Sequence, residues 1–181
     1  MPLYAFEGRK PKIGKTSFVH EEAVIIGKVT IGEGCYVAAG AVLRGDWGEI
    51  EVGDGSNIQE NVVIHARPES VTRLAKDSHV GHGAILHGCT LDEHVLVGMG
   101  AIINDDVHVG EGVVIGSGAL IPPKQDIPPR VLVVGVPARV VKELTPEMLE
   151  FTLWGTRLYQ TLPRRYHESL VPVSLEEATS E

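Results

Sequence analysis

The chain has 181 residues, of which 43% are hydrophobic and 22% charged, a composition that suits one well-buried domain. Its net charge of −8 provides no basic surface for nucleic acid or for an anionic membrane, which argues against both ligand classes. No apolar run reaches the roughly 18 residues of a membrane span, and the N-terminal segment lacks the apolar stretch of a signal peptide, so we expect a cytoplasmic protein.

Aliphatic side chains recur at every sixth position along most of the chain. The series comprises Val19, Ile25, Ile31, Val37, Leu43, Val52, Ile58, Ile64, Val80, Leu86, Leu91, Val97, Ile103, Val109, Ile115 and Ile121. A small residue usually follows four positions later, and glycine is frequent between them. Such hexads are typical of short strands that close a triangular coil. The pattern predicts an all-β solenoid, a parallel β-helix of hexapeptide repeats over residues 1–140; a β-sandwich with regular turns is the alternative.

Two segments interrupt the six-residue phase. Residues 48–51 and 66–73 are expected to leave the coil, either as loops that flank a binding surface or as tolerated surface insertions. The two cysteines, Cys35 and Cys89, fall inside apolar, glycine-rich repeats. We therefore expect them to be buried free thiols and not a disulfide.

The pattern changes to that of a helix after residue 138. Thr145 is suited to cap the helix, and Pro146 suits its first position. An apolar face is expected to pack on the solenoid and comprises Met148, Phe151, Leu158 and Leu162. We place this C-terminal helix within residues 141–168. The acidic, Ser/Thr-rich residues 169–181 have the composition of a disordered tail.

The repeat brings several of the eight histidines close to other polar residues. Residues that directly follow one corner of three successive coils stack above one another; these are Arg44, His65 and His87. By the same count, Glu60 and His82 stack on another face. The phase thus predicts a polar ladder on one side of the solenoid and a second polar pair around a bend.

Two histidines on adjacent coils can share one metal ion. Zn²⁺ takes imidazole nitrogens at about 2.0–2.1 Å, so His65 and His87 are expected to bind the same ion. His82 points from a different face, so a neighbouring subunit must supply it, which predicts a homotrimer with metal sites between subunits. His79 is the rival to His82 as the third ligand. The alternative is a set of hydrogen-bonded surface histidines without a metal.

Three motifs occur in a characteristic order, at residues 43–46 (LRGD), 57–65 (NIQENVVIH) and 81–89 (GHGAILHGC). Their order and sequence closely resemble those of the γ-class carbonic anhydrases over about residues 19–144. The segment 155–160 (GTRLYQ) further resembles a subgroup found with phenylacetate degradation and carnitine metabolism. The resemblance implies a left-handed β-helix and a trimer.

The resemblance also implies a catalytic metal. Zn²⁺, with Fe²⁺ or Co²⁺ able to replace it, would be held by His65 and His87 of one subunit and His82 of the next. Three neutral imidazoles leave a fourth position open for water. Gln59 matches the residue that orients this water or CO2, and Asn57 matches the residue that holds Gln59.

The remaining motif residues are charged. Arg44 and Asp46 match a pair at the subunit interface, and Glu60 is expected to pair with Arg44 across it. An ion-pair network that stabilises the trimer is the alternative to a chemical role. Two departures concern proton transfer: Trp47 stands where the best-characterised γ enzymes have a glutamate, and the segment 66–69 replaces an acidic loop.

Four functions compete on this basis. The first is reversible CO2 hydration by a zinc-bound hydroxide in a carbonic anhydrase-like metalloenzyme. The second is metal-dependent hydrolysis of an acyl-CoA thioester, in phenylacetate- or carnitine-type metabolism. The third is acyl transfer by a hexapeptide acyltransferase-like protein, in which an interface histidine acts as a base without metal. The fourth is a non-enzymatic scaffold.

Overall fold

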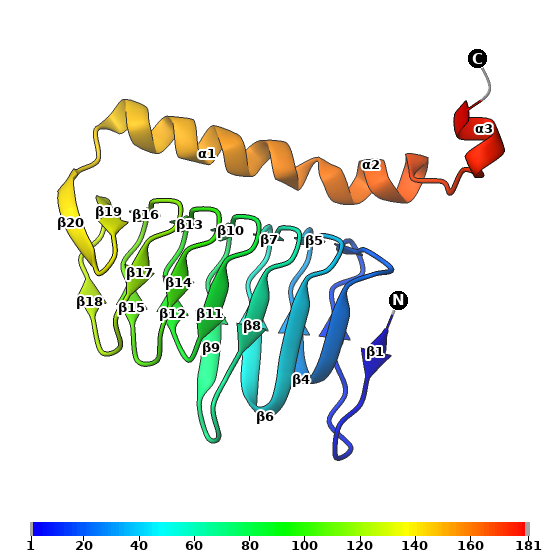
Figure 1. The fold of residues 1–181 in the computed structure, drawn as a ribbon, viewed down its shortest axis with the longest axis horizontal. Helices are drawn as coiled ribbons and strands as arrows, with labels where there is room; N and C mark the ends of the chain where they lie inside the picture. Colours follow the sequence, from blue (N-terminus) through cyan, green and yellow to red (C-terminus); the bar gives the residue numbers. More distant parts are fainter. Residues whose placement is uncertain (1, 180–181) are drawn as a thin grey trace.

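The computed structural model describes residues 2–179, and these form a three-sided parallel β-helix with helices along one side (Figure 1). The first face consists of β3 (Phe18–Val19), β5 (Tyr36–Val37), β7 (Asn57–Ile58), β10 (His79–Val80), β13 (Leu96–Val97), β16 (Val114–Ile115) and β19 (Val131–Gly135). The second face contains β8 (Val63–His65), β11 (Ile85–His87), β14 (Ile102–Ile103) and β17 (Leu120–Ile121). The third contains β9 (Val71–Leu74), β12 (Thr90–Leu91), β15 (His108–Val109) and β18 (Asp126–Ile127).

Two long strands join the second face to the third. These are β4 (Val24–Ile31) and β6 (Val42–Val52), which pair in parallel. The short strands β1 (Leu3–Tyr4) and β2 (Lys12–Ile13) pair with β4. At the opposite end, β20 (Ala138–Glu143) pairs antiparallel with β19. The parallel β-helix predicted from the hexad period is confirmed.

The interior is filled by the aliphatic residues of the hexad. Large side chains such as Ile58, Ile64 and Leu86 have no exposed surface, and small residues such as Ala84 fill the space between them. Each coil adds a layer at the inter-strand distance of about 4.8 Å, so the core is a stack of similar layers and not one central cluster. Both cysteines are free and buried, as expected.

The two interruptions differ from the prediction. Residues 48–51 do not leave the coil, because they lie within β6 and pair with β9. The segment 66–73 is a loop only as far as residue 70. Thr72 and Leu74 are buried, so alternation between inside and outside continues through β9. The period count missed this strand because the preceding loop shifts its phase.

The helical segment expected over 141–168 begins at α1 (Pro146–Gln160), because residues 138–143 still form β20. The Thr145 side chain accepts a hydrogen bond from the backbone N–H of Met148 at 3.3 Å and so caps the helix. Helix α2 (Leu162–Ser169) follows almost directly, and Figure 1 shows both helices along one side of the β-helix. α1 contacts β7 and α2 contacts β3, so the helices run back over the first face.

The predicted apolar face packs only in part: Met148 and Leu162 are partly buried. Phe151 and Leu158 are 71% and 47% exposed, whereas Thr156 is buried. A polar contact anchors the helix end, since the Gln160 Nε2 donates to Asp77 Oδ1 at 2.7 Å. Within the expected tail, α3 spans Leu175–Thr179 and is exposed, while residues 180–181 lie outside the described part of the chain.

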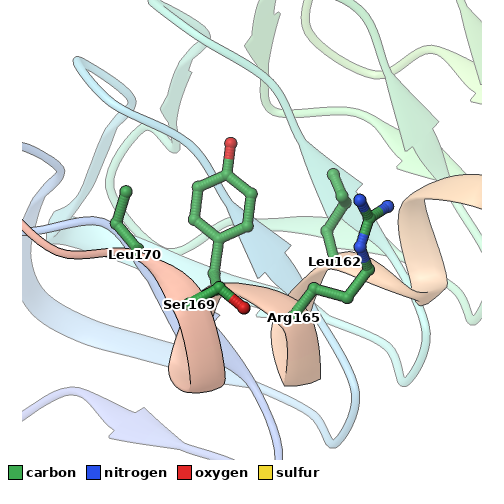
Figure 2. Close-up of a pocket in the computed structure, with 5 residues that line it drawn as sticks. Leu162, Arg165, Ser169 and Leu170 are labelled. Carbon is green, nitrogen blue, oxygen red and sulfur yellow. The ribbon is translucent and has the colours of Figure 1, made fainter.

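Helix α2 carries a small pocket of about 210 Å³ (Figure 2). Its lining residues are Leu162, Arg165, Tyr166, Ser169 and Leu170. No candidate residue from the sequence motifs lines this pocket, so it plays no part in the site described below. Among residues 2–179, no helix has both the length and the apolar character that crossing a bilayer requires.

Candidate functional site

The polar ladder expected on the second face is present. Arg44 of β6 is in register with His65 of β8, and His65 is in register with His87 of β11. The Nδ1 of His65 lies 3.1 Å from the Nε2 of His87. A glycine makes room for the first rung: a Cβ on Gly45 would lie 2.5 Å from the carbonyl oxygen of Lys28. The parallel register of β6, β8 and β11 thus brings these polar side chains onto one line.

A carboxylate binds the outer nitrogen of each ladder histidine. The Nε2 of His65 lies 3.0 Å from Asp46 Oδ1, and the Nδ1 of His87 lies 2.8 Å from Asp105 Oδ1. Because a carboxylate only accepts hydrogen bonds, both of these nitrogens carry the ring hydrogen in the neutral state. The lone pairs of the two rings therefore face each other across 3.1 Å. Such a pair requires a cation or a shared proton between the rings.

The pKa values of His65 and Asp46 are both shifted downward. Burial is the main cause that lowers the His65 pKa, and the positive charge of Arg44 adds to it. Burial would raise the pKa of Asp46, but hydrogen bonds from Arg44, His65 and the Trp47 backbone outweigh it and hold the pKa below its usual value. The Arg44 guanidinium donates to Asp46 Oδ2 at 2.6 Å.

The sequence did not identify Asp105. It lies in the turn after β14, one coil beyond His87. Extending the register of β11 with β14 by two positions places Asp105 beside Gly88, and a Cβ on Gly88 would lie 2.1 Å from Asp105 Oδ1. The glycine at position 88, which leaves room for the Asp105 carboxylate, was therefore the sequence signal for this contact.

His82 occupies a different place from the ladder. It lies in the turn between β10 and β11, and its Nδ1 is 2.5 Å from Glu60 Oε2. Glu60 occupies the equivalent turn of the preceding coil, as the phase predicted. Within residues 2–179, no group of three His, Cys, Asp or Glu side chains is arranged to hold a metal ion. One chain therefore brings His65 and His87 together and leaves His82 apart.

A second polar group surrounds Gln59. The amide of Gln59 contacts Asn57 at 3.0 Å and the Nε2 of His79 at 2.8 Å. Asn57 and Gln59 are almost fully buried. Burial lowers the pKa of His79 to about 4, so this imidazole is neutral near pH 7. Asn57 and Gln59 of the second motif are thus connected to His79 beneath α1.

A cleft of about 290 Å³ opens beside this group. Its walls include Gln59, His79, His82, Leu96, Met99, Ser117 and Tyr159. Glu60 holds the Nδ1 of His82, which leaves the Nε2 of His82 free to accept a proton in the cleft. A base oriented by a carboxylate next to a cleft is an arrangement suited to proton abstraction.

Trp47 lies next to the ladder. Its indole ring is 5.6 Å from the His65 ring, and the Arg44 guanidinium carbon is 5.9 Å from the indole centre. These distances are typical of an aromatic contact and a cation–π contact. The loop 66–70 is held by an ion pair between Arg67 and Asp106.

Comparison with known proteins identifies the family. The pattern described as bacterial transferase hexapeptide (six repeats) matches residues 10–45 and 88–123. The carnitine operon protein CaiE of Escherichia coli is 39% identical over 170 residues, which cover 94% of this chain and 87% of that protein. The chain belongs to the hexapeptide-repeat transferase family. This membership supports the left-handed twist expected for the β-helix. Hexapeptide-repeat proteins of this type typically form trimers.

Solved structures agree with this assignment. A Bacillus cereus protein assigned as an acetyltransferase has a TM-score of 0.91 and 34% identity, with 93% of this chain and 98% of that chain covered. A hexapeptide transferase family protein from Anaplasma phagocytophilum has a TM-score of 0.88 and 36% identity, with 91% and 98% covered. AntD, an N-acyltransferase from Bacillus cereus solved with dTDP and coenzyme A, shares the fold at a TM-score of 0.68 and 20% identity, with 87% and 100% covered.

The prediction of a carbonic anhydrase-like metalloenzyme is therefore wrong. The relatives reported above are described as hexapeptide transferases and CaiE, which points to a different class of protein. The histidines lie close together because equivalent positions of adjacent coils are in register. Proteins with different activities share this coil geometry, so it does not determine the reaction. Trp47 and the loop that replaces the acidic segment were the signals against this activity.

Proposed function

We propose that this protein transfers an acyl group from a coenzyme A thioester to a small-molecule acceptor, with His82 as the general base. The observation that carries the proposal is the Glu60–His82 pair beside the cleft, in a chain of the hexapeptide-repeat transferase family. The complex of AntD with coenzyme A supports the choice of donor, since that N-acyltransferase has the same fold.

The proposed step uses the free nitrogen of His82. Its Nε2 takes the proton of the acceptor amine or hydroxyl as that group attacks the thioester carbonyl. Glu60 holds the Nδ1–H and stabilises the imidazolium that forms. The C–S bond then breaks, the acyl group remains on the acceptor, and the imidazolium returns its proton to the departing thiolate. Atoms and charge balance without a further reactant.

Release of free thiol from acetyl-CoA and longer acyl-CoA esters, with and without amine and hydroxyl acceptors, tests this proposal. We expect thiol release that depends on the acceptor and yields an acylated product. Release that is equally fast without any acceptor would identify a thioesterase instead. No release with any ester would overturn the proposal.

We also propose that the chain forms a cytoplasmic homotrimer. In the family, trimers are typical, and both the Glu60–His82 pair and the ladder have half-exposed members that a neighbouring subunit could cover. The oligomeric mass in solution, measured by light scattering, tests this assembly. A monomer that still transfers acyl groups would separate the assembly from the activity.

A metal ion at the ladder is a separate proposal. The facing lone pairs of His65 and His87, each held by a carboxylate on the far nitrogen, fit Zn²⁺, with Fe²⁺ or Co²⁺ able to replace it. The third ligand would be His82 of a neighbouring subunit. A bound ion would supply a fixed positive charge at the interface. The Nε2 of His82 cannot both bind a metal ion and accept a proton. Loss of the ion from His82→Ala would make His82 a ligand and exclude it as the base, whereas a retained ion, held by His65 and His87, would leave His82 as the base.

A further inference from the structure

His79 interrupts an apolar ladder on the first face. One position of each successive strand is in register there: Phe18, Tyr36, Asn57, His79, Leu96, Val114 and Leu132. Of these, only Asn57 and His79 are strongly polar. Helix α1 lies over His79, with the Tyr159 ring 5.1 Å away in an edge-on contact and Thr156 Oγ1 3.4 Å from the Nδ1. This buried imidazole thus connects the helix to Gln59.

Two arrangements of hydrogen atoms fit the contacts of Gln59, because the oxygen and nitrogen of an amide exchange places on rotation by 180°. In the first, the Gln59 nitrogen donates to Asn57 Oδ1 and His79 Nε2, and the Asn57 nitrogen is buried without a partner. In the second, both amides are rotated, so Asn57 and the Nε2–H of His79 both donate to the Gln59 oxygen. The atom of Asn57 without a partner is then a carbonyl oxygen, which is better tolerated than an NH2 group.

Thr156 fits both arrangements, so the buried NH2 group of Asn57 is what favours the second. The hydroxyl hydrogen of Thr156 has two acceptors within reach, the Nδ1 of His79 at 3.4 Å and the Thr152 carbonyl at 3.3 Å. In the first arrangement the hydroxyl donates to the Thr152 carbonyl and accepts from an Nδ1–H of His79, whereas in the second it donates to the Nδ1. Donation to the Nδ1 leaves the ring hydrogen of neutral His79 on the Nε2.

The second arrangement also determines what Gln59 presents to the cleft. Its oxygen is used twice, so its NH2 group is the end that remains. Gln59 lines the cleft. Within residues 2–179, the amide atom of Gln59 that points away from His79 is not a fully buried atom without a partner. That group is therefore open to a ligand beside His82.

We propose that His79 is a positioning residue, hydrogen-bonded to Thr156 of α1 as the Nε2–H tautomer, which directs the amide N–H of Gln59 toward the carbonyl oxygen of the bound thioester. The inference rests on the proposed acyl transfer, in which negative charge develops on that oxygen and a donor fixed in advance stabilises it. It makes the docking of α1 a condition for an ordered cleft.

The tautomer of His79 tests the proposal without any activity measurement. In protein with ¹⁵N-labelled histidine, we expect the Nδ1 of His79 to show the chemical shift of an unprotonated nitrogen and the Nε2 that of a protonated one. Thr156→Val removes the hydroxyl at constant shape and should shift the Nδ1 signal, whereas Thr152→Val on the same helix should not. A protonated Nδ1 would overturn the proposal, even if acyl transfer is confirmed.

Kinetics test the consequence for the cleft. His79→Leu should fold, because Leu96 occupies the same ladder position on the next coil. We expect its kcat to fall about 10²-fold with little change in KM, the size of effect seen when one oxyanion donor is lost. His79→Gln keeps a donor near the Nε2 position and should restore part of the rate. An unchanged kcat in His79→Leu would overturn the positioning role, whereas no turnover in any variant, with the expected tautomer, would overturn only the proposed function.

Discussion

The Nδ1 of His65 and the Nε2 of His87 face each other at 3.1 Å, and Asp46 and Asp105 bind the opposite nitrogens of the two rings. Two neutral imidazoles held in this way present lone pairs to one another. Their mutual repulsion is relieved by a positive charge between them. The repulsion between these lone pairs, and not the spacing of the motif, indicates a cation at the ladder.

The metal content of the purified protein tests directly whether a cation binds at the ladder. We expect purified protein dialysed against Zn²⁺ to retain one ion per chain and to lose it in His65→Ala and His87→Ala. Asp105→Asn should weaken binding about 10- to 100-fold, as is typical when the partner of a ligating histidine is lost. His108→Ala is the matched control, because His108 also contacts two aspartates but lies on the third face. Equal zinc in all four variants would eliminate the site.

Substitution of the proposed base should remove acyl transfer. We expect His82→Asn to lower kcat about 10²- to 10⁴-fold, the usual contribution of a general base. Glu60→Gln should cost less, because the pair is half exposed and solvent already screens its charge. His94→Asn changes a histidine outside the cleft and should keep full activity. Full activity in His82→Asn would assign the chemistry to other residues.

The stability of the fold should fall below neutral pH because of His79. Its pKa is about 4 in the folded protein, against about 6.5 for a free imidazole, so the unfolded chain binds more protons between these values. The stabilisation is therefore full above pH 6.5 and is lost as the pH falls toward 4. We expect His79→Leu to reduce the loss of unfolding free energy between pH 7.5 and 5 by about 2 kcal/mol. Urea denaturation at both pH values measures this difference in unfolding free energy. Identical pH profiles for the wild-type protein and His79→Leu would contradict the prediction.

Two glycines should respond in opposite directions to the same substitution. Gly45→Ala places a Cβ against the Lys28 backbone and should destabilise the protein by about 3 kcal/mol, with loss of the Arg44–Asp46 geometry. Gly155 lies within α1, and a Cβ added there would have no neighbour within 4 Å, so Gly155→Ala should stabilise by about 0.5–1 kcal/mol. Thermal unfolding of both variants checks the signs. A stabilising Gly45→Ala would mean that the coils separate easily at this point.

Much of the fold followed from the sequence, because the hexad determines which side chains enter the prism. Leu43, Ile64 and Leu86 are in register and fully buried, as the phase requires. The packing of α1 did not follow. Phe151 remains exposed, since the helix packs mainly through Thr156, Tyr159 and Gln160, whose contacts no hydrophobic pattern reveals.

The site was predicted in part. The phase placed His65 beside His87 and Glu60 beside His82, because in-register stacking brings equivalent positions of adjacent coils together. Asp105 was missed, because its contact depends on the absent side chain of Gly88. The reaction was missed as well, because the same coil geometry serves unrelated chemistries.

Trp47 gives the protein an optical probe of its own. The chain has two tryptophans, and they lie in different surroundings: Trp47 contacts His65 and Arg44, whereas Trp154 stacks on Phe151 on the outer side of α1. Replacement of Trp154 by phenylalanine would leave a single tryptophan, whose ring is 5.6 Å from that of His65 and which can be excited selectively above the tyrosine absorption. Its emission would then follow events at the ladder in real time and without a label.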